Sequence, residues 1–193
     1  MRYSISETRT IRNDTKTLVF VLMLICFVFL VLGNIIFHLR FLPVKEHSIS
    51  RYFSFNLAEF PSFVEFFWAI FKACRLDILC VVLIAFSPLT RFPRVFLAVL
   101  FMCRSFLFGF CGAHLIAGIG ETAYFFRGFF SWLLFFLYHI SLFSILIHFG
   151  AFSAYFHRCI EPYRHLKYLL TIFCELALVV FLNLVYYFLI SKI

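Results

Sequence analysis

Residues 17–38, TLVFVLMLICFVFLVLGNIIFH, decide the fold class, because no charged residue interrupts this apolar run. A helix needs about 20 predominantly apolar residues to cross a bilayer. The run exceeds the apolar core of a signal peptide, which is about 7–15 residues, and residues 37–40 offer no small-residue cleavage site. We therefore interpret it as a retained membrane anchor. A polar arm precedes it, with Arg2, Arg9, Arg12 and Lys16.

The composition of the whole chain supports the same class. Of its 193 residues, 64% are apolar and 13% are charged, against about 45–50% and about 25% in soluble domains. A soluble domain of this length cannot bury so much apolar surface. Phenylalanine alone contributes 32 residues, which we interpret as lipid-facing side chains rather than an aromatic binding site. We predict an all-α, polytopic transmembrane helical bundle that forms a single domain over residues 1–193.

Four further apolar segments complete the predicted bundle, which has about five spanning helices. The expected spans are residues 17–38, 73–89, 95–117, 129–150 and 168–190. An interfacial helix at about 61–72 is the favoured interpretation of the segment before the second span, because its charge-free core is too short to cross. A direct continuation of this helix into the second span stays open. Trp68 and Lys72 suit the headgroup region, and Asp77 marks the membrane interface at the entry of the second span.

The positive charges indicate the orientation of this bundle. Five crossings place the two termini on opposite sides of the membrane. With the N-terminus inside, nine Lys and Arg residues lie inside and seven lie outside, five of those seven in one longer segment. We therefore predict a multi-pass protein of the cell membrane with a cytoplasmic N-terminus and an outside C-terminus. This placement accounts for the net charge of +8 without a nucleic-acid partner.

Ionisable residues inside the predicted spans are the candidates for chemistry. Arg104 lies near mid-membrane, where an unpaired charge costs at least about 2.5–3.5 kcal/mol. Glu175 and His139 lie at similar expected depths, so we predict an Arg104–Glu175 pair with His139 nearby. A structural clasp that fixes helix register is the favoured interpretation, and a proton or ion relay remains open.

Small residues on the third span indicate close helix packing. Ser105-x-x-x-Gly109 and Gly109-x-x-Gly112 allow another helix to approach, since lipid offers no hydrophobic drive for association. The neighbouring helix can belong to the same chain or to another, so a homo- or hetero-oligomer stays open.

No catalytic or cofactor motif is present in the sequence. The chain has no G-x-S-x-G elbow, phosphate loop, paired intramembrane glutamates or metal-ligand spacing. Its seven cysteines form no C-x-x-C pair, and they suit small buried hydrophobic positions. We expect no catalytic residues, no metal and no cofactor.

The layout resembles that of the stage II sporulation protein M family. The resemblance rests on residues 67–72 (FWAIFK), residues 87–93 (SPLTRFP) and residues 104–110 (RSFLFGF), which is similar to the family's Gly-x-x-x-Gly-Phe stretch. Members usually carry glycine where this chain has Ser105. The resemblance implies a non-catalytic membrane scaffold that recruits two cell-wall-degrading partners, stage II sporulation proteins D and P, during engulfment. Residues 40–72 and 118–128 would be the contact surfaces.

Two functions remain after this reasoning. The first is a non-catalytic membrane scaffold or assembly subunit. The second is a small transporter or permease subunit in which Arg104, Glu175 and His139 line a pathway. An enzyme is disfavoured, because the chain lacks a nucleophile or an acid–base pair.

Overall fold

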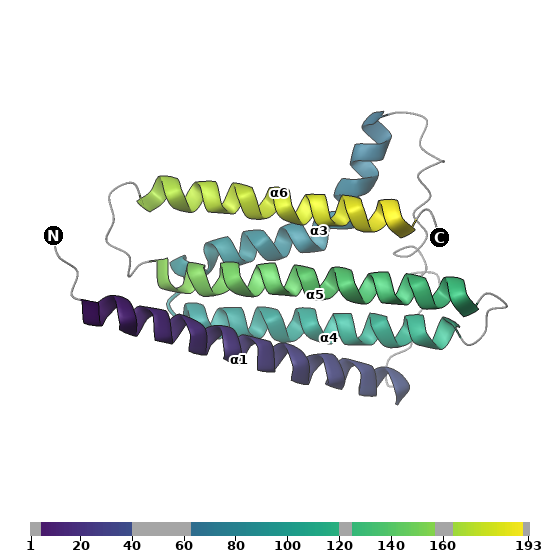
Figure 1. Cartoon of the computed structure of the whole chain (residues 1–193), viewed down its shortest axis with the longest axis horizontal. Helices are drawn as coiled ribbons and strands as arrows, with labels where there is room; N and C mark the ends of the chain where they lie inside the picture. Colours follow the sequence, from purple (N-terminus) through teal and green to yellow (C-terminus); the bar gives the residue numbers. More distant parts are fainter. Residues whose placement is uncertain (1–4, 40–62, 120–124, 157–163, 191–193) are drawn as a thin grey trace.

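The computed structural model describes residues 5–39, 63–119, 125–156 and 164–190. Within these ranges all of the regular structure is helical, as the composition predicted. Figure 1 shows the long helices lying side by side along one axis. They are α1 (Ile5–His38), α3 (Phe63–Phe86), α4 (Pro93–Ile119), α5 (Phe125–Tyr155) and α6 (Arg164–Ile190), with a short 3-10 turn η2 (Ser87–Leu89) after α3.

Four helices have the length and apolar character needed to cross a bilayer. The crossing segments are Asn13–His38, Pro93–Ala113, Phe129–Tyr155 and His165–Leu189. Large apolar side chains on them point away from the bundle, and Phe20 and Phe173 are each 67% exposed. An aqueous surface would not hold so many large exposed apolar side chains on consecutive turns, whereas lipid solvates them. These helices indicate a membrane protein, and they correspond to the expected spans 17–38, 95–117, 129–150 and 168–190.

Helix α3 covers both the segment expected to be interfacial and most of the expected second span, so the first leads directly into the second. The described part of both segments forms one helix, Phe63–Phe86, and the chain then passes into η2. Its first part stands away from the bundle and its last part lies along it (Figure 1). Helix α3 is not among the membrane-length apolar helices, since it carries Glu65, Lys72, Arg75 and Asp77.

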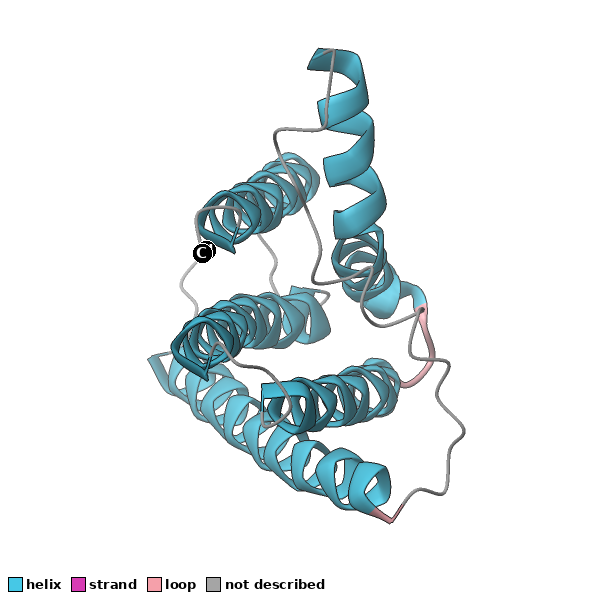
Figure 2. Ribbon diagram, turned by 90° about the vertical axis from the view of Figure 1, so that its right-hand side faces the viewer, coloured by secondary structure: helices cyan, strands magenta, loops and turns pink. Residues whose placement is uncertain are grey.

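The helices pack as a bundle around a buried apolar core. Helix α1 packs most extensively on α4, and α4, α5 and α6 follow one another as antiparallel neighbours, with α3 against α6 and α5. Figure 2 looks along the bundle, so that most helices are seen nearly end-on while the first part of α3 stands upright. Fully buried side chains come from every helix of the bundle, among them Leu22, Ile84, Leu97, Phe101, Leu142 and Val179.

A cluster of hydroxyl groups closes the turn between α3 and α4. Ser153 Oγ donates to the carbonyl of Ile84 at 2.8 Å, and Tyr168 Oη donates to the carbonyl of Ala85 at 2.7 Å. Ser87 Oγ lies 3.0 Å from Ser153 Oγ. The last turn of a helix leaves carbonyls without intrahelical partners, and lipid cannot satisfy them. The cluster therefore lets α3 end inside the bundle and ties α3 to α5 and α6.

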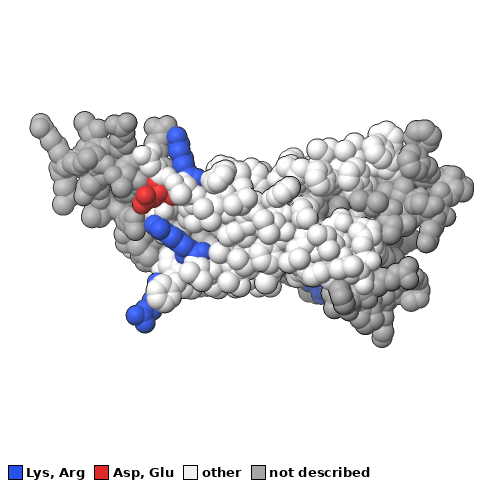
Figure 3. All heavy atoms as spheres, turned by 90° about the horizontal axis from the view of Figure 1, so that it is seen from below, with Lys and Arg blue, Asp and Glu red and all other residues white. Residues whose placement is uncertain are grey.

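Positive charge gathers at the end of the bundle where α1, α4 and α6 begin. Lys16 lies in the N-terminal half of α1, Arg91 just before α4, Arg94 in its first turn, and Lys167 in the first turn of α6. On the face drawn in Figure 3, Lys and Arg side chains lie mainly at this end. Because α6 ends at the opposite end from the start of α1 (Figure 1), the described chain enters and leaves at different ends.

Candidate functional site

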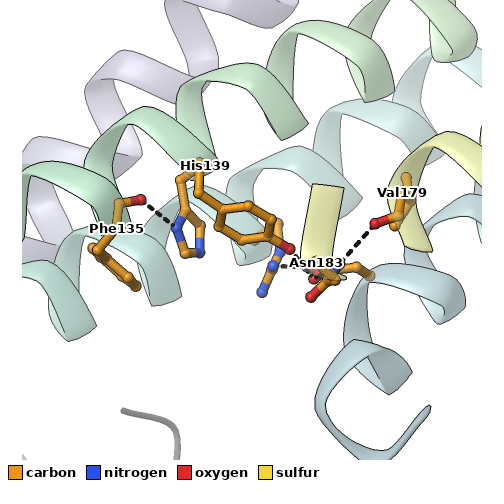
Figure 4. Close-up of polar contacts among 7 residues, drawn as sticks. Phe135, His139, Val179 and Asn183 are labelled. Atoms are coloured by element: carbon orange, nitrogen blue, oxygen red, sulfur yellow. Dashed lines mark hydrogen bonds and ion pairs between the residues drawn. The ribbon is translucent and has the colours of Figure 1, made fainter. Parts of the chain in front are cut away.

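The carboxylate of Asp77 joins four helices. Asp77 of α3 is 4% exposed, and its Oδ1 forms an ion pair with Arg104 Nη2 of α4. Tyr138 of α5 donates from Oη to Asp77 Oδ2 at 2.7 Å, and Asn183 of α6 donates from Nδ2 to the same oxygen at 3.4 Å. Figure 4 shows Asn183 of α6 and, on another helix, His139 near these contacts. We call Asp77, Arg104, Tyr138 and Asn183 the Asp77 hub.

The hub balances its charge within the bundle. An ionised carboxylate and a guanidinium are each costly to bury, and only pairing with further hydrogen bonds offsets that cost. Here the carboxylate has one cation and two neutral donors. Asn183 also donates to the carbonyl of Val179 at 2.9 Å (Figure 4), so both hydrogens of its amide are used.

His139 lies next to the hub, on the same helix as Tyr138. Its Nδ1 lies 2.9 Å from the carbonyl oxygen of Phe135, and Figure 4 shows this contact within one turn of α5. A carbonyl oxygen only accepts, so Nδ1 carries the hydrogen and Nε2 keeps a lone pair. The imidazole stacks on Phe108 with ring centroids 4.4 Å apart and planes inclined by 7°.

A cavity of about 210 Å³ adjoins the Asp77 hub. The hub side chains and His139 supply its polar wall. Its other walls are apolar and aromatic, and include Leu76, Leu107, Phe108, Phe135, Tyr186 and Tyr187. Arg104 Nε and Tyr186 Oη are buried and have no hydrogen-bond partner in the described part of the chain. The site thus combines a balanced ion pair with unsatisfied polar atoms beside an unfilled space.

The expected Arg104–Glu175 pair is corrected by this geometry, because the carboxylate that pairs with Arg104 belongs to Asp77. The α6 residue at the hub is Asn183, which follows Glu175 by eight residues, or about 12 Å along a helix. Helix α6 is therefore shifted along the bundle relative to α4, and Glu175 lies at another depth. Its neighbouring ionisable group is His148 of α5. Of the expected cluster, Arg104 and His139 share the cavity and Glu175 does not.

The interfacial position expected for Asp77 is also corrected, since its carboxylate lies inside the bundle. Trp68 and Lys72 are on the exposed surface of α3, with Lys72 Nζ 5.7 Å from the centroid of the Trp68 ring. Trp68 also stacks on Phe71, with ring centroids 5.8 Å apart. An aromatic ring next to a cation on an exposed helix face suits a membrane–water interface.

The small residues of α4 lie at its crossing with α1. A Cβ atom added to Gly109 would overlap the carbonyl oxygen of Leu30 and lie 2.8 Å from its carbonyl carbon. Gly33 of α1 meets the backbone of α4 in the same way, at Phe106. Ser105 is fully buried. Gly112 is different, because an added Cβ would approach only a Phe135 ring carbon at 3.7 Å. The close approach is within one chain.

Two hub residues, Tyr138 and Asn183, were not singled out from the sequence. Asn183 had a usable signal, since a lone amide in the apolar run of α6 needs partners in lipid. Tyr138 had a weaker one, as tyrosine is common in spans and near their ends. The described residues contain no group of three His, Cys, Asp or Glu side chains that could hold a metal ion.

No family model matches the chain, and no curated protein or solved structure matches it either. The likeness to the sporulation family therefore stays an expectation that rests on the stretches quoted above.

Proposed function

We propose that the protein is a non-catalytic integral membrane scaffold or assembly subunit. The observation that carries the proposal is the Asp77 hub, in which side chains from three helices bond to a carboxylate on a fourth. Intramembrane ionisable groups that serve a relay need a changeable protonation state. Here the carboxylate is held by a guanidinium, a phenol and an amide. That arrangement fixes the register of α3, α4, α5 and α6, as a structural clasp does.

The scaffold would sit in the cell membrane with five crossings, the fifth made by the last part of α3. The charge distribution supports a cytoplasmic N-terminus, because Lys16, Arg91, Arg94 and Lys167 lie at the end where α1 begins. With α3 counted, the C-terminus would be outside. The exposed Trp68 and Lys72 would then lie at the outer interface, beside the segment that the family resemblance assigns to partner contacts.

The proposed partners are cell-wall-degrading enzymes of the kind that the resemblance implies. The two expected contact segments are residues 40–72 and 118–128, of which 40–62 and 120–124 lie outside the described residues. The first turns of α3 belong to the described part and have Trp68, Phe71 and Lys72 exposed. These side chains are available to a partner without any change in the bundle.

The test is an affinity pull-down of the tagged full-length protein in mild detergent from its native cells, with partners identified by mass spectrometry. Recovery of cell-wall hydrolases or lytic transglycosylases supports the scaffold. The double variant Trp68→Ala/Lys72→Ala should lose them, whereas Asp77→Asn/Arg104→Gln should keep them if it still folds. If the partners are lost from a folded Asp77→Asn/Arg104→Gln variant and kept by Trp68→Ala/Lys72→Ala, the proposal that the Asp77 hub has only a structural role is contradicted.

A second candidate is a small transporter or permease subunit. The cavity beside Arg104 favours it, since polar groups near the middle of a bundle mark solute pathways in many transporters. Its distinguishing results would be recovery of an ATPase or a second permease subunit in the same pull-down, and loss of flux in a folded Arg104→Ala variant.

A further inference from the structure

A cleft of about 410 Å³ runs along the surface where α1 and α4 meet. On α1 it extends from Asp14 to Leu22, and on α4 it extends from Arg94 to Met102. Eight residues advance a helix by about 12 Å, so the two helices line the cleft over the same length. The lining between these ends is mainly apolar and includes Leu18, Val21, Val95, Ala98 and Val99. We call this feature the α1–α4 cleft.

The α1–α4 cleft has the depth of about one lipid leaflet. The crossing segments begin at Asn13 in α1 and at Pro93 in α4, so Asp14 and Arg94 lie at the membrane boundary. Half of the hydrocarbon core is about 15 Å thick, close to the length of the cleft. Farther along, the two helices come into backbone contact at Gly109, and the cleft ends before this contact. A single acyl chain matches this depth, whereas a spanning helix would need the whole bilayer.

Arg94 gives the boundary end of the cleft a cation whose donors can reach a ligand. Its side chain is exposed, and its guanidinium carbon lies 5.1 Å from the centroid of the Tyr155 ring. Tyr155 is buried, so the ring is a fixed support. A ring against the face of a guanidinium leaves the N–H donors, which lie in the guanidinium plane, available to an oxyanion. Within the described residues Arg94 forms no ion pair.

The charges around this end of the cleft favour an anionic ligand. Lys16 and Arg91 are exposed at the same end of the bundle, where basic side chains gather in Figure 3. Asp14 also lines the cleft, but it is half-buried and takes part in a separate interaction. The three basic side chains outnumber this carboxylate. Basic pockets between spanning helices, at the level of the headgroups, bind anionic lipid headgroups.

We propose that the α1–α4 cleft binds one anionic phospholipid from the leaflet on the side where α1 begins. The headgroup phosphate accepts hydrogen bonds from the guanidinium of Arg94, and one acyl chain lies along Val99 and Met102. A zwitterionic phospholipid has the same chains and phosphate but carries a cation beside the phosphate, so it binds more weakly among basic side chains. The inference goes beyond the scaffold role and does not depend on it.

The test is a competition between two lipids with identical chains, read by native mass spectrometry of the delipidated full-length protein in detergent micelles. Palmitoyl-oleoyl phosphatidylglycerol is anionic, and palmitoyl-oleoyl phosphatidylcholine is zwitterionic. At equal concentrations the first lipid bound should be phosphatidylglycerol about fivefold more often, the ratio that about 1 kcal/mol from one basic side chain gives. Equal binding of the two lipids overturns the inference, and so does a protein dimer that forms in place of the lipid complex.

Arg94→Gln tests the headgroup contact, since it removes the charge and keeps a long polar side chain. The preference for phosphatidylglycerol should fall to about one, while phosphatidylcholine binding is unchanged. Arg91→Gln is the matched control, because Arg91 is exposed at the same end and does not line the cleft. It should change the preference by less than about twofold, since exposed charges away from the lipid are screened. Equal effects of the two variants would show general attraction to the basic end and overturn the inference.

Ala98→Phe tests the acyl-chain contact and stays informative even if Arg94→Gln fails to fold. Ala98 is partly exposed in the apolar part of the cleft, so a phenylalanine there fills the space for the chain. The peak of the lipid-bound protein should be lost for both lipids. Ala177→Phe, on the exposed face of α6, is the matched control and should keep both. Unchanged lipid binding by folded Ala98→Phe places the lipid elsewhere and overturns the inference.

Discussion

The Asp77–Arg104 ion pair allows a quantitative prediction about stability. Asp77→Asn keeps the size of the side chain and leaves an oxygen that Tyr138 Oη can still reach, but it removes the charge that balances Arg104. Breaking a buried pair by removing one partner costs about 3–5 kcal/mol, and an unpaired Arg at mid-membrane costs about 2.5–3.5 kcal/mol on insertion scales. We expect Asp77→Asn to lower the free energy of unfolding by about 3 kcal/mol.

The double variant Asp77→Asn/Arg104→Gln separates the interaction energy of the ion pair from the effect of each substitution alone. With neither charge present, two amides can bond to each other, and the loss should fall to about 1 kcal/mol. The coupling energy between the two positions should then be at least about 2 kcal/mol. The measurement is reversible unfolding of the full-length protein in mixed micelles, carried out on wild type, both single variants and the double variant.

Glu175→Gln is the matched control for this cycle, since it removes a carboxylate of a membrane-length helix without touching the Asp77 hub. It should change the free energy of unfolding by less than about 1 kcal/mol and should show no coupling to Arg104. Two results would refute the reasoning. One is additivity of Asp77→Asn and Arg104→Gln within about 0.5 kcal/mol. The other is strong coupling of Arg104 to Glu175.

Three further predictions address the other parts of the bundle. Gly109→Val should destabilise the protein by more than about 2 kcal/mol, because the valine side chain would overlap the backbone of α1. Gly112→Ala should change the stability by less than about 1 kcal/mol. Thermal unfolding in detergent measures both variants. Ser153→Ala should cost about 1–3 kcal/mol in the same assay, since it leaves the hydroxyl cluster at the end of α3 incomplete, and the exposed Ser141→Ala should cost almost nothing. In a Trp132→Phe variant, the fluorescence of Trp68 in liposomes should be quenched most by lipids brominated near the headgroup, and maximal quenching from the bilayer centre would contradict the interfacial position of the first part of α3.

The helices themselves could be predicted from composition and run length. Residues 17–38, 95–117, 129–150 and 168–190 each fall within a helix of the structure, because the backbone in lipid has no partners except its own. The segment that the sequence left open was α3. Its charges at Lys72, Arg75 and Asp77 suggested a boundary between two elements, whereas the helix continues through them. An apolarity criterion cannot recognise a charged helix that is neutralised by its neighbours.

The need of Arg104 for a partner was predictable, and the identity of the partner was not. Matching depths required knowing where each helix starts, and an error of two turns moves a side chain by about 11 Å. Helix α6 is shifted relative to α4, which brings Asn183 rather than Glu175 to the Asp77 hub. The position of α3 was also decisive, since only tertiary packing brings Asp77 between α4, α5 and α6. The cavity has no sequence signal, because it arises where the packed side chains fail to fill space.

One short stretch of helix α4 makes two different contacts with neighbouring helices. At about 100° per residue, Arg104, Phe108 and Cys111 share one face of the helix, and Ser105 and Gly109 share a neighbouring face. The first face lines the cavity and holds Asp77, while Gly109 on the second lets α1 approach to backbone contact. Lipid supplies no hydrophobic force to bring helices together, so backbone packing and polar bonds must do so. Residues 104–111 provide one of each. A substitution in this stretch therefore affects only the helix contact made by its own face. Gly109 and Arg104 are five positions apart, yet Gly109 controls the packing of α1, and Arg104 controls the register of α3, α5 and α6.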